Sequence, residues 1–473
     1  MKIISTNPSK NYEVIGEVEI STEKEIKVAV LKAKEAFLKW SSLSISERAK
    51  ILSSFIKISE NNFERIAKLI ALETGRPIRS ARDNVSGGIK YFKYYINNAF
   101  SCLRAKTTFK NKKEIHRVYR EPWGVVAAIC PWNYPYMNIS WQCGQALLSG
   151  NTIVYKNSRE NILFSKLVNE LITKSDIPEG VFNVIYGDSN AGRQLINQDI
   201  DMISFTGSSK IGQLLTKIAA EKFIPIMTEL GGSSPCIIFD DIDIDSVVEK
   251  IYDRRFINAG QSCSAIKRLI VHKRKFNELV NKLCKIISTK KVGDALDEDT
   301  DIGPLVSKCQ LDLLVDLLEK QIETSIKKGA KVEIGGHKPK NLQGAYYSPT
   351  ILTKISTDMS VWKEETFGPV LPIVSFSTEQ EAIYLANDTE YGLNAYILTN
   401  NKKLFNRVAL QLKAGSIAQN NVDFFDPRNP FGGYKKSGMG RIHGEWGFDD
   451  FTQVKLISEE SNDSVKYINA KNI

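Results

Sequence analysis

The stretch Ile203-Ser204-Phe205-Thr206-Gly207-Ser208-Ser209-Lys210-Ile211-Gly212 says most about the architecture of this chain. Its apolar start predicts a buried strand, Gly207 predicts a tight turn, and Ser208 predicts the N-cap of a helix. Strand, glycine turn and helix in direct succession are typical of a βαβ unit. Helix N-termini favour phosphate groups, so the turn is also a candidate binding site.

The same pattern continues on both sides of this stretch. Short apolar runs predict strands, and amphipathic stretches predict helices between most of them. Strands are expected at 125–130, 152–156, 182–186, 202–206 and 224–230, with helices at 162–174, 191–197 and 208–220. After Pro235, strands are expected at 236–239, 269–272, 332–334, 370–376 and 395–398, with helices at 247–255, 276–288 and 307–328. This alternation predicts an α/β fold with two doubly wound parallel-sheet domains.

The two ends of the chain depart from this alternation. The first hundred residues read as helices, beginning with a capping box formed by Thr22 and Glu25. Residues 107–121 are polar, basic and inclined to β-structure, so they predict an inserted hairpin arm with 451–457 as its partner strand. Such arms often serve oligomerisation, and a plain surface hairpin is the alternative.

The composition argues against several classes of protein. The 473 residues are too many for one hydrophobic core, and 42% hydrophobic with 25% charged residues is typical of a globular protein. The 64 Lys and Arg residues are scattered without interleaved aromatics, which favours a solvated surface over a nucleic-acid partner. Seven cysteines without C-x-x-C spacing argue against a disulfide framework and against a metal site. Without a leader or a run long enough for a membrane span, we expect a reduced, cytoplasmic protein.

Four residues carry candidate site chemistry. Cys263 follows small and polar residues, where a thiol fills a hydrophobic core poorly. Its candidate function is therefore that of a nucleophile. Glu229 precedes two glycines and offers a base, and the Asn133 amide directly after a strand could donate to an oxyanion. Lys156 ends a strand and could bind a ribose or a phosphate. The alternatives are a structural cysteine, a surface glutamate, a structural aromatic turn and a charged strand end.

Six motifs together resemble the aldehyde dehydrogenase family. They are Pro-Trp-Asn-Tyr-Pro at 131–135, Phe-Thr-Gly-Ser at 205–208, Glu-Leu-Gly-Gly at 229–232, Gly-Gln-Ser-Cys at 260–263, Glu-Glu-Thr-Phe-Gly-Pro at 364–369 and Asn-Pro-Phe-Gly-Gly-Tyr-Lys-Lys-Ser-Gly at 429–438. Each alone is weak, but all occur in the family's order and extend over essentially the whole chain. The resemblance implies oxidation of an aldehyde to the acid with NAD or NADP, and no metal. The family's variant Rossmann domain lacks G-x-G-x-x-G, and a true G-x-G-x-x-G is also absent here.

The resemblance also implies residue roles. Cys263 would attack the aldehyde to form a thiohemiacetal, Asn133 would stabilise the oxyanion, and Glu229 would activate water to hydrolyse the thioester left after hydride transfer. The residues expected to bind the cofactor are Trp132, Lys156, Ser158, Arg159, Gly207, Ser208, Leu230, Glu365 and Phe367. Residues 1–106 and 122–231 would form the cofactor-binding domain, 232–448 the catalytic domain, and 107–121 with 449–473 the oligomerisation arm of a homodimer or homotetramer.

Two departures from the family's pattern bear on specificity. Many NAD-preferring relatives place a glutamate where Arg159 stands, and without that carboxylate to repel a 2′-phosphate we favour NADP, while Glu160 keeps NAD open. The expected substrate tunnel contains Met137, Trp141, Ile257 and Phe424. Trp141 and Ile257 stand where relatives acting on succinate semialdehyde place arginines, so an aliphatic or aromatic aldehyde is favoured.

Three alternatives stay open at this stage. An NADP-dependent succinate-semialdehyde dehydrogenase is possible if Arg254, Arg255 or Arg428 supplies the missing charge. Transfer of the acyl group to coenzyme A or phosphate is a second alternative, and a non-catalytic relative is a third. The glutamate at 229 argues against acyl transfer, and its presence together with Cys263 argues against a non-catalytic protein.

Overall fold

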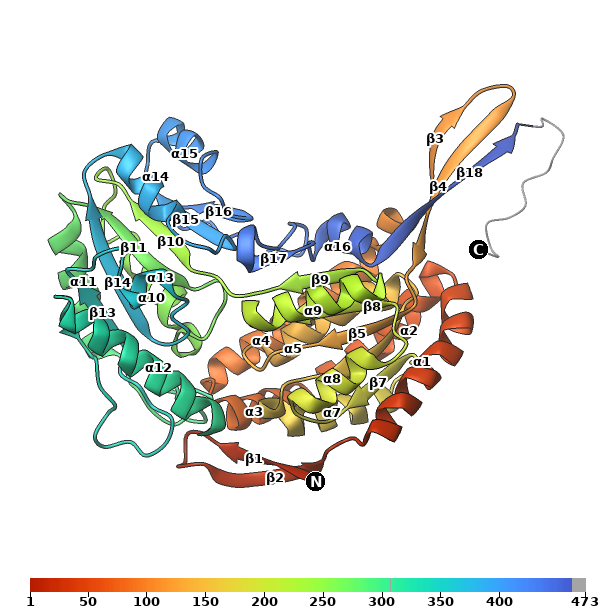
Figure 1. Cartoon of the computed structure of the whole chain (residues 1–473), viewed down its shortest axis with the longest axis horizontal. Coiled ribbons are helices and arrows are strands. Elements are labelled where there is room, and N and C mark those ends of the chain that lie inside the picture. Colours follow the sequence, from red (N-terminus) through yellow and green to blue (C-terminus); the bar gives the residue numbers. More distant parts are fainter. Residues whose placement is uncertain (307, 462–473) are drawn as a thin grey trace.

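Two open sheets lie side by side in the computed structural model, which describes residues 1–306 and 308–461, and an antiparallel arm projects from one end (Figure 1). The first sheet has six strands in the order β17-β9-β8-β5-β6-β7. Its strands are β5 (Val125–Ile129), β6 (Thr152–Lys156), β7 (Phe182–Ile185), β8 (Met202–Thr206), β9 (Ile226–Glu229) and β17 (Gly438–Met439). All are parallel except β17, which pairs antiparallel with β9. A two-residue piece of the segment predicted as catalytic domain thus completes this sheet.

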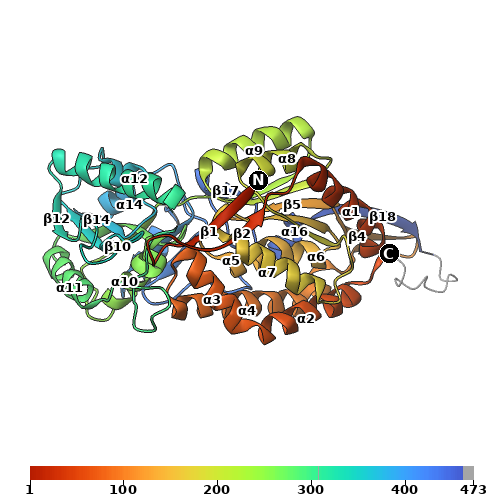
Figure 2. The ribbon, with the colours of Figure 1, turned by 90° about the horizontal axis from the view of Figure 1, so that it is seen from below.

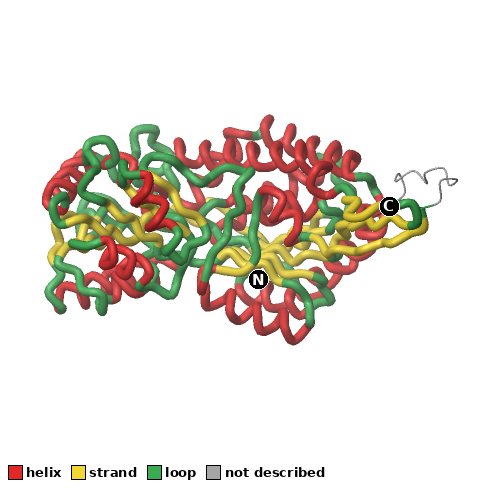
Figure 3. The backbone as a smooth tube through the Cα atoms, turned by 90° about the horizontal axis from the view of Figure 1, so that it is seen from above, coloured by secondary structure: helices red, strands yellow, loops and turns green. Residues whose placement is uncertain are grey.

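Helices cover both faces of the first sheet (Figure 3). They are α1 (Glu23–Ser42), α2 (Ile45–Asn61), α3 (Phe63–Thr74), α4 (Ile78–Leu103), α5 (Pro135–Ile139), the π-helical turn Ser140–Gly144, α6 (Gln145–Leu148), the 3₁₀ turn Arg159–Asn161, α7 (Ile162–Thr173), α8 (Ser189–Asn197) and α9 (Ser209–Lys222). Alternate residues of a strand point to opposite faces, so Val126 and Ala128 pack with α2, α3 and α4, while Val125 and Ala127 pack with α1, α8 and α9. Burial on both faces explains why these strands read as continuous apolar runs.

The second sheet has seven strands in the order β12-β13-β14-β11-β10-β15-β16. Its strands are β10 (Ser234–Ile238), β11 (Ile266–His272), β12 (Lys331–Ile334), β13 (Thr350–Thr353), β14 (Val370–Phe376), β15 (Asn394–Leu398) and β16 (Ser416–Gln419). The remaining helices are α10 (Val248–Phe256), the 3₁₀ turn Ile257–Gly260, α11 (Phe276–Thr289), α12 (Lys308–Lys327), α13 (Ser360–Lys363), α14 (Glu379–Asn387), α15 (Lys402–Ala409), the 3₁₀ turn Lys435–Ser437 and α16 (Gly444–Asp450). Only β12 is antiparallel to its neighbour. The predicted fold class of two doubly wound sheets is confirmed.

The arm is a three-stranded antiparallel sheet of β3 (Lys106–Lys110), β4 (Glu114–Pro122) and β18 (Thr452–Glu460). β3 pairs antiparallel with β4, which confirms the predicted hairpin, and β18 pairs with β4 from Thr452 opposite Pro122 to Glu460 opposite Glu114, which confirms the predicted partner strand. Seen from below, the arm extends beyond the first sheet, at the end away from the second (Figure 2). Of the predicted arm, residues 462–473 lie outside the described residues, as does residue 307, where the helix 307–328 was expected to begin.

The prediction that the first hundred residues are helical is wrong at the very N-terminus. β1 (Lys2–Asn7) and β2 (Glu13–Glu19) form an antiparallel hairpin instead. Ile3 and Val18 pack on Ile162 of α7, so tertiary contact rather than local propensity selects this structure. The capping box of Thr22 and Glu25 is confirmed at the start of α1. Among the described residues, no helix has the length and apolar character needed to cross a membrane.

Candidate active site

A cavity of about 910 Å³ opens at the carboxyl ends of β5, β6, β8 and β9 and reaches across to loops of the second sheet. Ligands of open α/β sheets bind at this edge, because the turns that follow parallel strands meet there. Thirteen of the predicted site residues line this single cavity: Asn133, Glu229, Cys263, Trp132, Lys156, Ser158, Arg159, Gly207, Ser208, Leu230, Glu365, Phe367 and Trp141. They come from segments separated by more than two hundred residues, so the tertiary fold brings them together.

Three residues predicted for the substrate tunnel do not line this cavity. The Met137 side chain packs against α4, where a Cβ at Gly87 would lie 3.1 Å from Met137 Cε. Ile257 is 41% exposed at the end of α10. Phe424 packs in an aromatic group, with its ring centroid 5.4 Å from that of Tyr396 and the two rings tilted by 36°.

Cys263 is half-buried and follows a loop with unusual backbone geometry. Asn258, Ala259 and Gly260 all have positive φ values, of 53°, 52° and 73°. A Cβ at Gly260 would lie 2.3 Å from the Gly368 carbonyl oxygen, so only glycine fits there. Burial raises the pKa of the Cys263 thiol to about 12, which the nearby Lys267 ammonium opposes and the Glu365 carboxylate reinforces. The thiol therefore needs a base, or an added positive charge, before it can react as the thiolate.

Glu229 ends β9 and is 4% exposed. Within the described part of the chain, neither carboxyl oxygen has a hydrogen-bond partner. Burial raises the pKa of Glu229 well above its ordinary value, although Arg441 opposes this shift. A buried, unpartnered carboxyl group at a cavity wall is costly for folding and is suited to accepting a proton from a ligand or a water molecule.

The Asn133 side chain is held close to the Cys263 loop. Its Nδ2 donates to the Gln261 carbonyl oxygen at 3.2 Å. Its own backbone carbonyl accepts from Arg76 at 2.7 Å and from Asn258 at 3.3 Å. These contacts tie the turn after β5 to the loop before Cys263, so an amide donor and a thiol face the same cavity.

Trp141 lies in the π-helical turn between α5 and α6. Its ring contacts those of Tyr91 at 5.7 Å and Phe431 at 6.2 Å between centroids, and Tyr134 is stacked at 6.4 Å. Tyr134, Trp141 and Phe431 all line the cavity. The end of the cavity near Cys263 therefore has an aromatic wall.

The other end of the cavity is suited to a phosphate-bearing ligand. Ser208 caps α9, with its Oγ accepting from the Ile211 N–H at 3.4 Å. Lys156 lies at the end of β6, and its Nζ donates to the Asn157 carbonyl oxygen at 3.2 Å. Burial lowers the pKa of Lys156 to about 8, and the Asp188 carboxylate opposes that shift.

The predicted strand 182–186 and helix 191–197 are confirmed as β7 and α8, but sequence reasoning missed that the turn between them and the start of the helix belong to the site. Asp188 caps α8, and Asp188, Gly192 and Arg193 line the cavity. The signal was present, because Gly187-Asp188-Ser189 follows the expected strand 182–186 as Gly207-Ser208 follows 202–206. Apolar residues of α9 complete this wall: Ile211, Leu214, Leu215 and Ile218.

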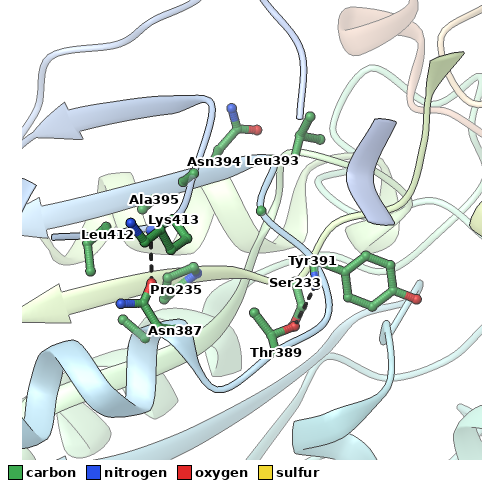
Figure 4. A pocket seen from close by; sticks show the side chains of 13 residues that line it. Ser233, Pro235, Asn387, Thr389, Tyr391, Leu393, Asn394, Ala395, Leu412 and Lys413 are labelled. Carbon is green, nitrogen blue, oxygen red and sulfur yellow. Dashed lines mark hydrogen bonds between the residues drawn. The ribbon is translucent and has the colours of Figure 1, made fainter. Parts of the chain in front are cut away.

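A second, much smaller pocket of about 10 Å³ lies in the second sheet, between Ser233, Pro235 and the segment 386–395 (Figure 4). The Lys413 N–H donates to Asn387 Oδ1 at 2.9 Å across it. This volume holds about one water molecule. It contains neither the thiol nor the carboxylates of the large cavity, so the large cavity is the candidate active site.

A doubly wound fold with an elongated cavity at the strand ends, and with a thiol and carboxyl groups at one end of it, is typical of a dinucleotide-dependent oxidoreductase. The chain belongs to the aldehyde dehydrogenase family, whose family model matches residues 1–457. Its activity is the NAD(P)-dependent oxidation of an aldehyde.

Individual relatives agree over nearly the full length. A chloroplastic betaine aldehyde dehydrogenase of Atriplex hortensis is 37% identical over 97% of this chain and 93% of its own. The structure of an NADP-dependent enzyme of E. coli has a TM-score of 0.93 at 33% identity, covering 97% of this chain and 95% of that one. The NAD+ complex of an aldehyde dehydrogenase from Bacillus cereus also has a TM-score of 0.93 at 33% identity, covering 98% and 94%.

Proposed function

We propose that Cys263, Asn133 and Glu229 carry out the aldehyde oxidation. The Cys263 sulfur attacks the aldehyde carbon and forms a thiohemiacetal, while the Asn133 amide donates to the developing oxyanion. NAD(P)+, held in the same cavity, would supply the acceptor for the hydride that leaves the thiohemiacetal carbon. Glu229 then takes a proton from the water that hydrolyses the resulting thioester, and the acid leaves. The observation that supports this most directly is that the Glu229 carboxyl group, which has no hydrogen-bond partner among the described residues, lines the same cavity as the half-buried thiol.

The residues of the long cavity fit a dinucleotide. The cap of α9 at Ser208 and the cap of α8 at Asp188 present two helix N-termini, and Gly207 and Gly192 line the wall between them. Lys156 would bind the adenosine ribose, Trp132 and Leu230 would line the path, and Glu365 beside Phe367 would hold the nicotinamide ribose.

NADP is the favoured cofactor. Arg159 and Arg193 both line the phosphate end of the cavity with Ser158, and two guanidinium groups suit a 2′-phosphate. Arg159 Nε also lies 3.9 Å from Glu160 Oε1, so part of its charge is already opposed. The test compares kcat/KM for NADP and NAD in the wild type and in Arg193→Ala. A wild-type preference for NAD above about tenfold would overturn this assignment.

An uncharged aliphatic or aromatic aldehyde is the favoured substrate. The three arginines that could have received a carboxylate are engaged elsewhere: Arg254 donates to the Asn420 and Val422 carbonyls, Arg255 to the Thr366 carbonyl, and the exposed Arg428 to Asp426. The aromatic wall of Tyr134, Trp141 and Phe431 supports a second candidate, an aldehyde with a quaternary ammonium group held by cation–π contacts.

A single assay separates these substrates. NAD(P)H absorbance is followed with purified protein against hexanal, benzaldehyde, betaine aldehyde and succinate semialdehyde, with both cofactors. Highest kcat/KM for succinate semialdehyde would contradict the proposal, and turnover by Cys263→Ala would contradict the mechanism. Acid formation without coenzyme A or phosphate is expected, because Glu229 is present to activate water.

The same proposal assigns a role to each segment of the chain. Residues 1–106 and 122–231 bind the cofactor, 232–448 carry Cys263, and the arm of 107–121 and 449–473 joins subunits of a homodimer or homotetramer. Exposed apolar side chains on β18 support the assembly role, since Val454 is 71% and Leu456 60% exposed.

We also assign the protein to the cytoplasm, on the basis of its scattered cysteines without disulfide spacing.

A further inference from the structure

Lys267 is a buried cation directly behind the cavity wall. It lies on β11, four positions after Cys263, and is 1% exposed. Its Nζ donates to Glu365 Oε1 and lies 5.0 Å from the centroid of the Phe367 ring. Cys263, Glu365 and Phe367 line the cavity, whereas Lys267 does not. The Lys267 ammonium therefore does not contact a ligand in the cavity directly and can affect it only through the residues that it contacts.

The Glu365 carboxylate is held from two sides. Besides Lys267, the Gly232 N–H donates to Oε1 at 3.0 Å. Oε2 lies against Gly231, where a Cβ would come within 2.1 Å of it. No hydrogen bond from the described residues reaches Oε2. One oxygen is thus fixed by two donors, and the other is available to a ligand hydroxyl.

The charges around the thiol make Lys267 more than a packing residue. Among the described groups whose charge acts on Cys263, Glu365 and Glu229 oppose formation of the thiolate and Lys267 favours it. Arg255 also acts on Glu365 and Lys267, but it donates to the Ile266 and Gly368 carbonyls. A buried ion pair is weak evidence for stability, since well-packed apolar residues commonly replace one without loss. A role in the site accounts for this one.

We propose that Lys267 is a positioning residue of the active site with two effects. It holds the Glu365 carboxylate so that Oε2 is available to a ribose hydroxyl of the cofactor, and it offsets the Glu365 charge beside Cys263 so that the thiolate can form. The inference rests on the proposed function for the roles of Glu365 and Cys263.

The test measures alkylation of Cys263 by iodoacetamide in the full-length protein without cofactor, across a pH series, with the modified peptide identified by mass spectrometry. Lys267→Met removes the ammonium that offsets the Glu365 charge beside the thiol and is expected to slow Cys263 alkylation about tenfold at a given pH, the effect of one pKa unit. Lys267→Met with Glu365→Gln removes both charges, and alkylation is expected to return to within about threefold of wild type. Lys273→Met, an exposed lysine just beyond β11, is the matched control and leaves the rate unchanged.

The second readout is KM for the cofactor. It is expected to rise about tenfold in both Lys267→Met and the double variant, because neither has a held carboxylate. Rescue of alkylation without rescue of KM separates the two effects from a general structural defect. Wild-type alkylation in Lys267→Met, or a double variant as slow as the single one, would overturn the proposal.

Two further outcomes are informative. If Lys267→Met does not fold, Glu365→Gln alone tests the proposal. This variant removes the carboxylate charge beside the thiol and is expected to speed alkylation of Cys263 about threefold. An unchanged alkylation rate would refute the proposal. Failure of the proposed function looks different, since it would appear as aldehyde turnover by Cys263→Ala and leave the alkylation rates as they are.

Discussion

At the scale of single residues, burial is the largest cause of the shifted pKa values in the cavity. It raises the pKa of Cys263 to about 12, raises that of Glu229 well above its ordinary value, and lowers that of Lys156 to about 8. All three side chains line one cavity. Each therefore sits nearer to its neutral form in the unliganded protein, where a proton can be gained or lost on binding.

Glu229→Gln is expected to lower steady-state turnover about 100-fold or more, because the amide cannot take a proton from the hydrolytic water. A burst of NAD(P)H followed by a slow phase should appear, since the thioester accumulates. In the wild type, turnover should fall as the pH is lowered, because protonation of Glu229 removes the base. The midpoint of this fall should lie above the pH range in which an ordinary carboxyl group titrates, because burial raises the pKa of Glu229. Glu221→Gln, an exposed glutamate at the end of α9, is the control. Equal turnover in both variants would refute the role of Glu229.

Cofactor affinity is expected to weaken as pH rises through about 8. The Lys156 pKa is lowered to about 8 by burial, so the cationic form that can donate to a ribose or phosphate oxygen is lost across that range. Quenching of tryptophan fluorescence measures the Kd, since Trp132 lines the same cavity. Lys156→Gln should bind more weakly at low pH and lose this dependence. A Kd in the wild type that is constant across the range would contradict the prediction.

At the scale of elements, the arm is notable because β3 and nearly all of β18 are exposed. β18 exposes Val454 and Leu456 on one face, and β3 exposes Phe109 at 45%. Strands with unpaired edges and exposed apolar side chains commonly pair with another chain.

Val454→Asp combined with Leu456→Asp is expected to reduce the assembly to monomers, because like charges replace the apolar face. Size-exclusion chromatography with light scattering gives the mass, and circular dichroism checks that the fold is kept. Gln453→Asp, on the opposite face of the same strand, is the matched control and should keep the wild-type mass. An unchanged mass in the double variant would show that another surface assembles the subunits.

At the scale of the whole molecule, the cavity joins the two sheets. Glu229 and Lys156 come from the first sheet, while Cys263 and Glu365 come from loops of the second. A ligand that contacts both sides must stabilise their arrangement, because binding to the folded form alone shifts the unfolding equilibrium.

NADP+ at about 100 times its Kd is expected to stabilise the protein by about 2.7 kcal/mol. Differential scanning calorimetry should show a higher Tm, with a larger shift from NADP+ than from NAD+ at equal concentration. Arg193→Ala should lose the difference between the two cofactors, since it removes one guanidinium at the phosphate end. A larger shift from NAD+ in the wild type would contradict the assigned preference.

The local strand and helix units of this protein could be predicted from the sequence alone. The strand 202–206, its glycine turn and the helix that follows were readable because hydrophobic period and turn chemistry are local properties, and the structure has them at β8 and α9. Which side chains meet depends on how segments far apart in the sequence pack together. That packing forms the hairpin β1–β2 on α7, leaves Met137 and Ile257 outside the cavity, and places Lys267 behind Glu365. The physical reason is that burial, electrostatic environment and contact between distant segments arise from packing, which no local pattern encodes.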